Sequence, residues 1–422
     1  MNKTKKNPYL KDTKRLPLQK QGWLILHIHG NAHDRGFSHG TLLKNELQKV
    51  LTIFPFVVKR EKKIEITEYL EKVDKLITPN LIQHFPEIYN ELKGISLGSG
   101  ISLDFLIGWN AYCCMDYKEK CSAFIASGNF TKKGDIIMAH NTHSDFFTGE
   151  LLNIILYITP EKGFPFVMQT SAGLVWSTTD WFLSKSGIIG CETTIADINY
   201  KPDFLHGDPL FCRIRMAIQY GESLDDYISI MLKNNAGDYA CSWLFANIKN
   251  GEIMRFEIGK KIHNVERTFN GVYYGMNSPF DPILREKETN NHDFYNIKTS
   301  SGMRNQRLNY LLNDKYFGKI TIHSAKKIIS DHVDLSNKSI GKPNNNTICK
   351  HSEIVPPKFK LFGTTDGKVT STELAKNLNF FGRFGSACGK RNFSVKNHSK
   401  YKHYLRDIHK WNWTLLSIGE KN

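Results

Sequence analysis

The chain has 422 residues, of which 40% are hydrophobic, 12% aromatic and 23% charged, and its formal net charge is +16. These values are typical of a globular protein and exclude a disordered chain, a collagen and a disulfide-rich miniprotein. The best apolar stretch, residues 151–158, is interrupted by Asn153 and falls well short of the roughly 18 residues that a membrane-spanning helix needs.

In chain order, the first regular element predicted is a strand over residues 22–30, where apolar side chains alternate with polar ones. Residues 30–40 are rich in Gly and His and are expected to form a loop. Residues 41–117 show mostly helical spacing of apolar side chains, and Ser102 is a candidate N-cap within them. Residues 41–117 are therefore predicted to be the first helical region of the chain.

Strands dominate the next part of the chain. Residues 121–200 contain several short apolar runs separated by turn residues, and residues 209–233 return to a helical pattern with Ser223 as a candidate cap. Asn250-Gly251 lies between two alternating runs and predicts a β-hairpin. Residues 335–350 are expected to form a long loop. Helices, strands, helices and strands in this order predict a single large α+β domain, layered as an αββα sandwich.

The positive charge gathers at the two ends. Residues 1–20 hold seven Lys or Arg and one Asp, and residues 383–422 hold nine Lys or Arg and two Asp or Glu. Solvated basic tails are the preferred interpretation, and contact of the basic termini with anionic surfaces remains the alternative. Nucleic acid is not expected as a partner, because no RNA-binding aromatic motif or zinc finger is present.

The sequence gives no sign of a secretory route or of a cofactor. Residues 1–20 lack the apolar segment of a secretory signal, so the cytoplasm is the default expectation and the eight Cys are expected to be free thiols. No CxxC occurs, and the closest His groupings match no standard ligand spacing, so we expect no metal and no other cofactor. These groupings are His27 with His29, His33 with His39, and His140 with His143.

The stretch CSAFIASGNFTKKGDIIMAHNTHSDF, residues 121–146, carries the strongest chemical signal. A hairpin over it would bring residues 140–143, His-Asn-Thr-His, beside Cys121. A thiol, an imidazole, an amide and a hydroxyl at one place are the groups of nucleophilic acyl transfer. The plain alternative is that Cys121 is a small buried residue of a strand.

This stretch resembles the nucleophile segment of phospholipase B-like proteins, in which Cys-Ser-Ala is followed by His-Asn-Thr on the paired strand. Further stretches are similar in the same order: GIIGCETTIA at 187–196, GDYACSW at 237–243 and DGKVTSTEL at 366–374. The N-terminal part of the chain is similar to autoproteolytic acyltransferases of the penicillin acyltransferase type. The similar stretches are GWLILHIHGNAHDRGFSHGTLL at 22–43 and PEIYNELKGISLGSG at 86–100. Both families are N-terminal nucleophile (Ntn) hydrolases, and their fold is an αββα sandwich.

The resemblance implies self-cleavage between Lys120 and Cys121. It divides the chain into a basic tail (1–20), an N-terminal helical segment that becomes the small subunit (21–120) and a catalytic part (121–422), with the processed subunits remaining associated. The implied activity is hydrolysis of an amide or ester acyl bond in a lipid or another small molecule. The alternatives are an acyltransferase of the same fold and a catalytically weak basic binding protein.

The resemblance also assigns site residues. Cys121 matches the nucleophile, and His140, Asn141 and Thr142 match the strand end that orients it. Substrate contacts are expected from His143, Thr193 and Cys241. Two positions depart from the pattern: His143 stands where Trp or Asp is usual, and Ala240 and Cys241 stand where an oxyanion-binding Asn is expected.

Several residues keep two interpretations. Asn247, Asn277 or a backbone amide could replace the missing oxyanion donor. Glu192 and Thr194 either line the pocket or end a strand, whereas Arg35 and His39 are expected to have structural roles. Asp366 and Lys368 are expected to form a turn, because Asp-Gly favours turns.

Overall fold

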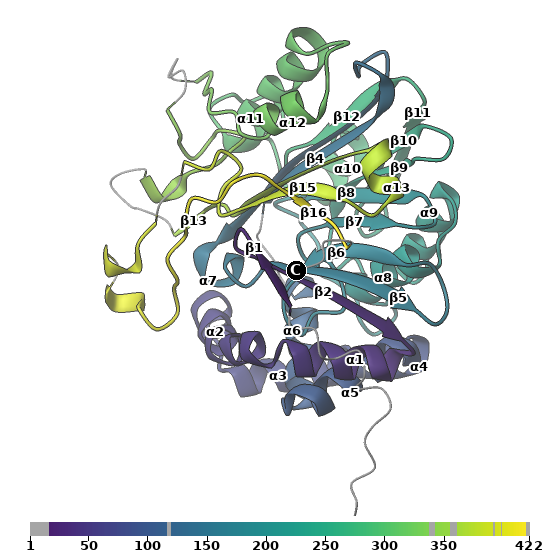
Figure 1. Cartoon of the computed structure of the whole chain (residues 1–422), viewed down its shortest axis with the longest axis vertical. Helices are drawn as coiled ribbons and strands as arrows, with labels where there is room; N and C mark the ends of the chain where they lie inside the picture. Colours follow the sequence, from purple (N-terminus) through teal and green to yellow (C-terminus); the bar gives the residue numbers. More distant parts are fainter. Residues whose placement is uncertain are drawn as a thin grey trace, which may run out of the picture.

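Two β-sheets form the centre of the protein in the computed structural model, which describes residues 17–115, 120–336, 342–354, 361–390, 393–397 and 399–418. Helices cover them at both ends of the view in Figure 1. The predicted α+β class and single large domain are confirmed. The finer prediction of an Ntn-type αββα sandwich stays a prediction.

The first sheet has nine strands among the described residues, in the order β1-β2-β5-β6-β7-β8-β9-β10-β11. Only β2 and β5 pair in parallel; the other neighbours are antiparallel. The strands are β1 Leu18–Lys20, β2 Trp23–Gly30, β5 Ile154–Pro160, β6 Phe166–Thr170, β7 Trp181–Ser184, β8 Ile188–Thr194, β9 Cys241–Asn247, β10 Glu252–Ile258 and β11 His263–Thr268. The antiparallel pairing of β9 with β10 confirms the hairpin predicted at Asn250-Gly251.

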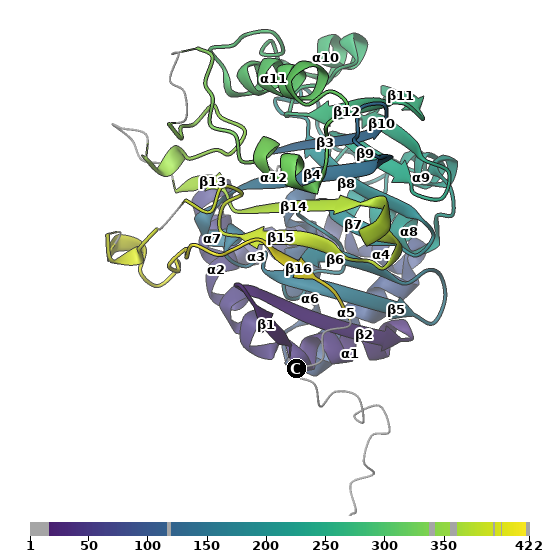
Figure 2. The same ribbon diagram turned by 45° about the horizontal axis from the view of Figure 1, so that its top comes forward.

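The second sheet runs in the order β12-β3-β4-β14-β15-β16, and β13 pairs with the end of β4. Figure 2 shows its strands one above another in this order. They are β3 Lys120–Gly128, β4 Gly134–Asp145, β12 Gly271–Gly275, β13 Phe362–Thr364, β14 Asp366–Ser371, β15 Phe380–Phe384 and β16 Thr414–Leu416. The hairpin of β3 and β4 confirms the one predicted for residues 121–146, and it sets Thr142 directly opposite Cys121.

The helices fall into groups along the chain. The N-terminal group is α1 Ala32–Leu42, α2 Lys44–Lys62, α3 Ile66–Leu76, α4 Thr78–His84, α5 Pro86–Ser99 and α6 Leu103–Ala111. The others are α7 Phe146–Gly149, α8 Leu210–Tyr220, α9 Leu224–Leu232, α10 Pro282–Glu288, α11 Ser300–Tyr310, α12 Ile322–Ile328 and α13 Thr372–Lys376. Ser223 caps α9 through a capping box, as the sequence predicted.

Three large apolar clusters hold these elements together. One joins the first sheet to helices of the N-terminal group and to α8 and α9. A second lies between the two sheets and includes Ala123 and Ile125 of β3, and a third joins the second sheet to α11 and α12 through Phe124 and Ala126. Since side chains alternate along a strand, β3 and β4 each present one face to the first sheet and the other to α11 and α12.

The prediction of a loop at residues 30–40 is wrong, because α1 already begins at Ala32. The Asn31 side chain caps it by accepting a hydrogen bond from the Asp34 amide. The glycines that suggested a loop serve close helix packing instead: a Cβ at Gly36 would lie 1.9 Å from the Glu91 carbonyl oxygen of α5, and one at Gly94 would lie 2.1 Å from the His33 carbonyl oxygen.

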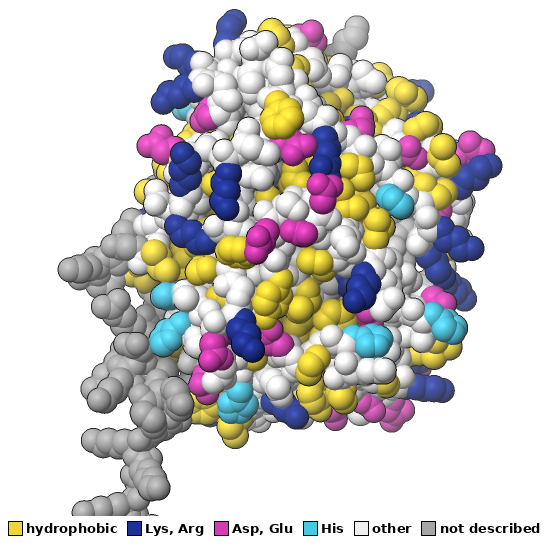
Figure 3. Space-filling view, turned by 90° about the vertical axis from the view of Figure 1, so that its right-hand side faces the viewer, with side chains coloured by type: hydrophobic (Ala, Val, Ile, Leu, Met, Phe, Trp, Pro, Cys, Tyr) yellow, Lys and Arg dark blue, Asp and Glu magenta, His cyan; other side chains and the backbone are white. Residues whose placement is uncertain are grey.

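The ends of the chain are described in part. Of the predicted basic tail, residues 1–16 lie outside the described residues, and Leu18–Lys20 form β1 against β2. On the face drawn in Figure 3, the Lys and Arg side chains of the described residues are interspersed with Asp and Glu. Within the described residues, no helix combines the length and the apolar character needed to cross a membrane.

Candidate functional site

Cys121 is the second residue of β3 and lies on the face turned toward the first sheet, which it shares with Ala123 and Ile125. Its side chain is buried, with 2% of the residue exposed. Lys120 precedes it as the first residue of the strand and pairs with His143 of β4. The bond predicted to be cleaved is thus part of a paired strand in the continuous chain.

Two side chains hold the backbone of Cys121. The Cys121 amide donates to Oδ1 of Asn277 at 3.2 Å, and Nη1 of Arg304 donates to the Cys121 carbonyl oxygen. Arg304 also donates to Oδ1 of Asn277 at 2.8 Å and to the Ser122 hydroxyl at 3.0 Å. Burial lowers the pKa of Arg304 to about 9. The peptide groups on both sides of the Cys121 Cα are therefore fixed by one polar network.

Asn277 follows β12 in an uncommon backbone conformation, with a φ of 79°. Its Nδ2 donates to the Thr194 carbonyl oxygen at 2.8 Å, which connects Cys121 to the end of β8. Such left-handed conformations at residues other than Gly cost energy and are found at functional sites more often than elsewhere. Of the two asparagines proposed as oxyanion donors, Asn277 contacts Cys121, whereas Asn247 accepts from the Lys249 amide at the far end of β9.

Two buried carboxyl groups lie next to the Cys121 thiol. Asp180 and Glu192 each have an oxygen within 4.8 Å of the Cys121 Sγ. The Tyr239 hydroxyl lies 3.0 Å from Glu192 Oε1, 3.4 Å from Asp180 Oδ2 and 2.8 Å from the Thr194 hydroxyl. Burial raises the pKa of Asp180 to about 6, and burial together with the charge of Asp180 holds the pKa of Glu192 well above its usual range.

A buried ion pair completes this face. Lys368 Nζ lies 3.1 Å from Asp366 Oδ1 and 3.0 Å from the Thr142 hydroxyl, and the Thr142 amide donates to the same Asp366 oxygen at 3.1 Å. Both charged residues belong to β14, so the turn predicted for them is wrong. Asp-Gly is a turn signal only where the chain is free to turn, and here Asp366 pairs with Phe384 and Lys368 with His140 in the sheet.

The four residues of the His-Asn-Thr-His stretch alternate between the two faces of β4. His140 and Thr142 face the first sheet with Cys121, because they lie opposite Ala123 and Cys121. Burial, with the charge of Lys368, holds the pKa of His140 well below its usual range, so its imidazole is neutral at pH 7.

Asn141 and His143 lie on the opposite face. Asn141 Oδ1 accepts from the Ser122 amide at 3.1 Å, and its Nδ2 donates to the carbonyl oxygens of Ile329 and Ile348 at 2.7 and 3.0 Å. His143 Nε2 lies 3.0 Å from the same Ile348 oxygen. Asn141 therefore fixes the strand that carries Cys121, and the His143 ring contacts backbone on the side away from the thiol.

The remaining predicted residues lie on β8 and β9. Thr193 is buried, and a Cβ at Gly275 would come within 2.1 Å of its hydroxyl, so Gly275 allows β12 to approach it. Cys241 pairs with Thr194 and belongs to the core cluster of the first sheet, where burial raises the pKa of its thiol well above the usual range.

Arg35 and His39 have the structural roles that were expected. Arg35 pairs with Glu91 at 2.7 Å, and His39 Nε2 accepts from the Gly173 amide at 2.8 Å.

Asp180, Tyr239 and Arg304 were not predicted from the sequence. Tyr239 belongs to the GDYACSW stretch, residues 237–243, whose resemblance to phospholipase B-like proteins indicates the region but not the role of this tyrosine. Asp180 has a positive φ of 52° and immediately precedes β7, and Arg304 lies on α11; neither belongs to a recognisable local motif.

The arrangement offers a thiol, carboxyl groups that can accept its proton and donors that hold the adjacent peptide. Cys121, Asp180 and Glu192 are also three groups that could bind a metal ion. The ammonium group of Lys368, whose charge lowers the pKa of Asp180, would oppose a cation there. The contacts therefore favour acid-base and nucleophilic chemistry at this face.

No protein-family model matches the chain. A curated relative, protein dcd1B of Dictyostelium discoideum, is 24% identical over 223 residues, which cover 47% of this chain and 43% of that protein. The match thus spans less than half of the relative's length.

Two solved structures of conjugated bile acid hydrolase from Clostridium perfringens, each carrying a point substitution, were also compared. One is 10% identical to this chain and the other 13%; each covers 72% of this chain at a TM-score of 0.38, with 93% and 100% of the other chain covered. At these values neither a shared fold nor a shared function follows, so the chain is similar to these proteins without being placed in a family.

Proposed function

We propose that the protein is a self-processing cysteine hydrolase of the Ntn type, with Cys121 as its nucleophile. The observation that carries the proposal is that the thiol, amide and carbonyl of this one residue have separate polar neighbours. The thiol lies near the Asp180 and Glu192 carboxyl groups. The amide donates to Asn277, and the carbonyl oxygen accepts from Arg304. A cysteine buried only for packing needs none of these contacts.

The first reaction is with the chain itself, because a thiol that is 2% exposed can reach its own preceding peptide before any external substrate. The Cys121 sulfur attacks the Lys120 carbonyl carbon, and its proton passes to the Asp180 carboxylate. The bond between Lys120 and the Cys121 nitrogen breaks, and that nitrogen takes the proton and becomes an amine. Water then hydrolyses the thioester, which gives a Lys120 carboxylate and restores the thiol. The net change is the addition of one water molecule.

After cleavage the new α-amine of Cys121 becomes the general base. An α-amine has a pKa of about 7.7–8.0 and a thiol about 8.5, so proton transfer between them near neutral pH costs little. His140, Asn141 and Thr142 keep the strand oriented. Asn277 stays a candidate oxyanion donor only if its Nδ2, which donates to the Thr194 carbonyl oxygen in the uncleaved chain, turns toward the substrate after cleavage. Thr193 and Cys241 stay proposed substrate contacts, whereas His143 lies on the face of β4 opposite Cys121, so contact with a substrate at the thiol is not expected from it.

The substrate class follows from the resemblance alone. We infer an amide or ester acyl bond in a lipid or another small molecule, as in phospholipase B-like proteins. Transfer of the acyl group to an amine would be the same chemistry with a different acceptor, since the acyl-thioester intermediate is shared.

Intact mass and N-terminal sequencing of the purified full chain test self-cleavage. The expected fragments are about 14 and 35 kDa, in proportion to residues 1–120 and 121–422 of the 48.5-kDa chain, and the larger begins Cys-Ser-Ala. Cys121→Ala is expected to remain whole, and Cys212→Ala, a buried cysteine of α8, is the matched control that still cleaves. A wild-type chain that stays intact after prolonged incubation would overturn the proposal.

Turnover is tested separately on the cleaved protein. A panel of fatty-acyl amides and lysophospholipids is offered, and release of the fatty acid is measured by mass spectrometry. Acyl release that disappears in Cys121→Ala supports hydrolysis, whereas a cleaved protein that is inert on all of these substrates would contradict the proposed substrate class but leave self-cleavage standing.

A further inference from the structure

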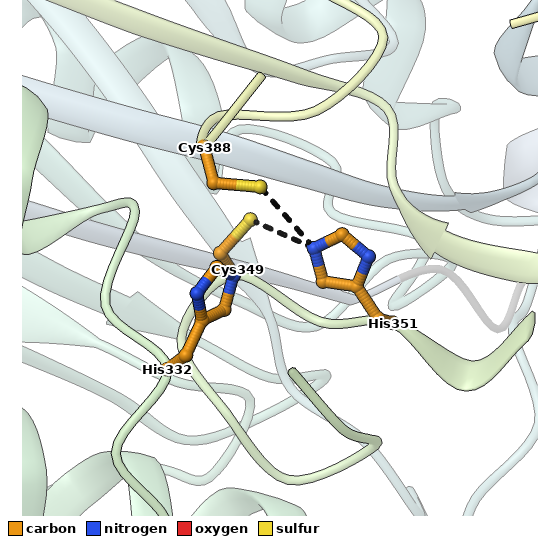
Figure 4. A group of neighbouring side chains, drawn as sticks. All are labelled: His332, Cys349, His351 and Cys388. Carbon is orange, nitrogen blue, oxygen red and sulfur yellow. Dashed lines mark hydrogen bonds between the residues drawn. The ribbon is translucent and has the colours of Figure 1, made fainter. Parts of the chain in front are cut away.

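Two cysteines and two histidines converge at a place the sequence did not indicate. They are His332, which follows α12, Cys349 and His351 just before a short 3₁₀ helix, and Cys388 in the loop after β15. One ligand atom from each lies within 4.8 Å of all the others. Figure 4 shows the two sulfurs and the His351 ring nitrogen turned toward one another, with His332 beside Cys349.

The distances match those of a tetrahedral metal centre. His351 Nε2 lies 3.5 Å from Cys349 Sγ and 3.4 Å from Cys388 Sγ. Zinc at its usual bond lengths to thiolate and imidazole would hold a sulfur and a nitrogen about 3.6 Å apart at the tetrahedral angle. The four side chains therefore need little movement to share one ion.

The outer contacts also fit. His351 Nδ1 lies 2.9 Å from Glu353 Oε1, the carboxylate partner that orients a histidine ligand and sets its tautomer. The Lys390 amide donates to Cys388 Sγ at 3.3 Å, which favours the thiolate form that a metal needs. The His332 side chain is buried, and its ring centroid lies 5.2 Å from that of His351.

We propose that His332, Cys349, His351 and Cys388 form a structural zinc site. Two thiolates and two neutral imidazoles fill all four positions of a tetrahedral ion, which leaves no open position for catalysis. They also neutralise its charge, so a site in which three of the four residues are buried carries no net charge into the interior. Zn²⁺ suits this mixed sulfur and nitrogen set better than Mg²⁺ or Ca²⁺, which take oxygen ligands.

The site would stabilise the segments that support the β3–β4 hairpin. The Cys349 amide donates to the Asp331 carbonyl oxygen at 3.0 Å, and the Ser330 hydroxyl donates to the Ala387 carbonyl oxygen at 2.8 Å, so the three ligand-bearing segments already touch. Ile348, next to Cys349, supplies the carbonyl oxygen that accepts from Asn141. Zinc would therefore fix the backbone on which Asn141 depends, without contacting Cys121.

Metal content of the full chain tests the site. The protein is purified under reducing conditions without chelator, dialysed against Zn²⁺ and then against metal-free buffer, and analysed by mass spectrometry for metals. One zinc per chain is expected, and Co²⁺ in its place should give the visible absorption of a tetrahedral thiolate centre. Cys388→Ala should lose the ion, whereas Cys212→Ala and His206→Ala should keep it. Glu353→Gln should bind zinc about 10–100-fold more weakly, as loss of an outer-sphere partner typically does.

A second measurement needs no variant and covers the case in which Cys388→Ala does not fold. Alkylation of the wild-type chain is mapped by peptide mass spectrometry, and Cys349 and Cys388 should be protected until a zinc chelator is added. A metal-free chain after dialysis against Zn²⁺, equal zinc in Cys388→Ala and wild type, or a Cys349–Cys388 disulfide in the thiol-blocked protein would each overturn the proposal. Performing the assay in Cys121→Ala as well separates it from self-cleavage.

Discussion

The two faces of the β3–β4 hairpin differ in how their polar groups are used. On the face toward α11 and α12, Asn141 uses both ends of its amide on three backbone groups. On the face toward the first sheet, Cys121 and Thr142 lie among titratable groups, and burial shifts the pKa of both Asp180 and Glu192 upward. Neighbouring residues of β4 therefore face different surroundings: Asn141 anchors the backbone, and Thr142 lies beside the proposed nucleophile.

The difference gives the two faces separate tasks. Saturated contacts to backbone stabilise a fold, whereas ionisable groups with shifted pKa values are typical of sites where protons move. Arg304 connects the two faces, because it lies on α11 and donates hydrogen bonds to the Cys121 carbonyl oxygen and to Asn277. Changes on the reactive face should therefore affect cleavage, and changes on the anchoring face should affect stability.

The largest effect is expected from Arg304→Met. It removes the charged donor from the Cys121 carbonyl and from Asn277, so the rate of self-cleavage should fall by about 10²–10³-fold, as for loss of one preorganised donor. The rate is followed on denaturing gels after rapid purification. Arg307→Met is the matched control on the same helix, where Arg307 pairs with Asp331. Equal rates for the two variants would remove Arg304 from the reactive network.

Asn141→Ala should act mainly on stability. It leaves the Ser122 amide and two carbonyl oxygens without their partner, which should lower the free energy of unfolding by about 2–4 kcal/mol. Urea unfolding is measured in the Cys121→Ala background, so that cleavage does not interfere. The control Asn90→Ala, at an exposed position of α5, is expected to change stability by less than about 0.5 kcal/mol. An Asn141 variant that is fully stable yet does not cleave when Cys121 is present would break the distinction between the faces.

Asp180→Asn should alter the pH dependence of stability. The pKa of Asp180 is raised from 3.8 to about 6 in the folded state, so between these values the folded chain holds more protons than the unfolded one. Its free energy of unfolding therefore falls as pH rises through this window, by about 2–3 kcal/mol in total from this group. Unfolding of Cys121→Ala chains at pH 4.5 and 7 should show this fall, and Asp180→Asn should make it smaller without abolishing it, because the pKa of Glu192 is also raised. The exposed Asp314→Asn should keep it in full; a smaller fall there too would point to a global effect.

Thr142→Val should have the smallest effect. The Lys368 ammonium group loses one hydroxyl partner but keeps Asp366, so stability should fall by about 1 kcal/mol. Self-cleavage should slow by less than ten-fold, which the same gel assay measures. A drop comparable to that of Arg304→Met would show that the Thr142 hydroxyl takes part in the chemistry.

The local elements of the fold were predictable because their signals are local. The alternation of apolar and polar side chains, together with turn residues, predicted the β3–β4 and β9–β10 hairpins. Ser223 predicted the start of α9. The Gly-rich residues of α1 misled because glycine serves both turns and close helix contacts, and only the position of α5 decides between them. Asp366-Gly367 misled for the same reason, since pairing in the sheet outweighs a turn preference.

The candidate site was predictable only where it coincides with the hairpin. Cys121, His140 and Thr142 share a face because two neighbouring strands carry them. Asp180 and Arg304 reach Cys121 from distant elements, and no sequence spacing encodes that approach. The four proposed zinc ligands lie on segments far apart in the chain, with no CxxC to mark them. The sequence thus pointed to Cys121, the proposed nucleophile, but not to the groups around it.

The position of β2 determines whether the protein can refold after the proposed cleavage. This strand lies between β1 and β5 in the first sheet, although it precedes the proposed cut and β5 follows it. Before cleavage the chain can unfold and refold as a single body. Afterwards, β2 could return to its place only by a second-order encounter between two polypeptides, whose rate falls with dilution. Self-cleavage would therefore make unfolding effectively irreversible at low concentration. The folded assembly persists, but a cleaved molecule that unfolds does not regain its native structure.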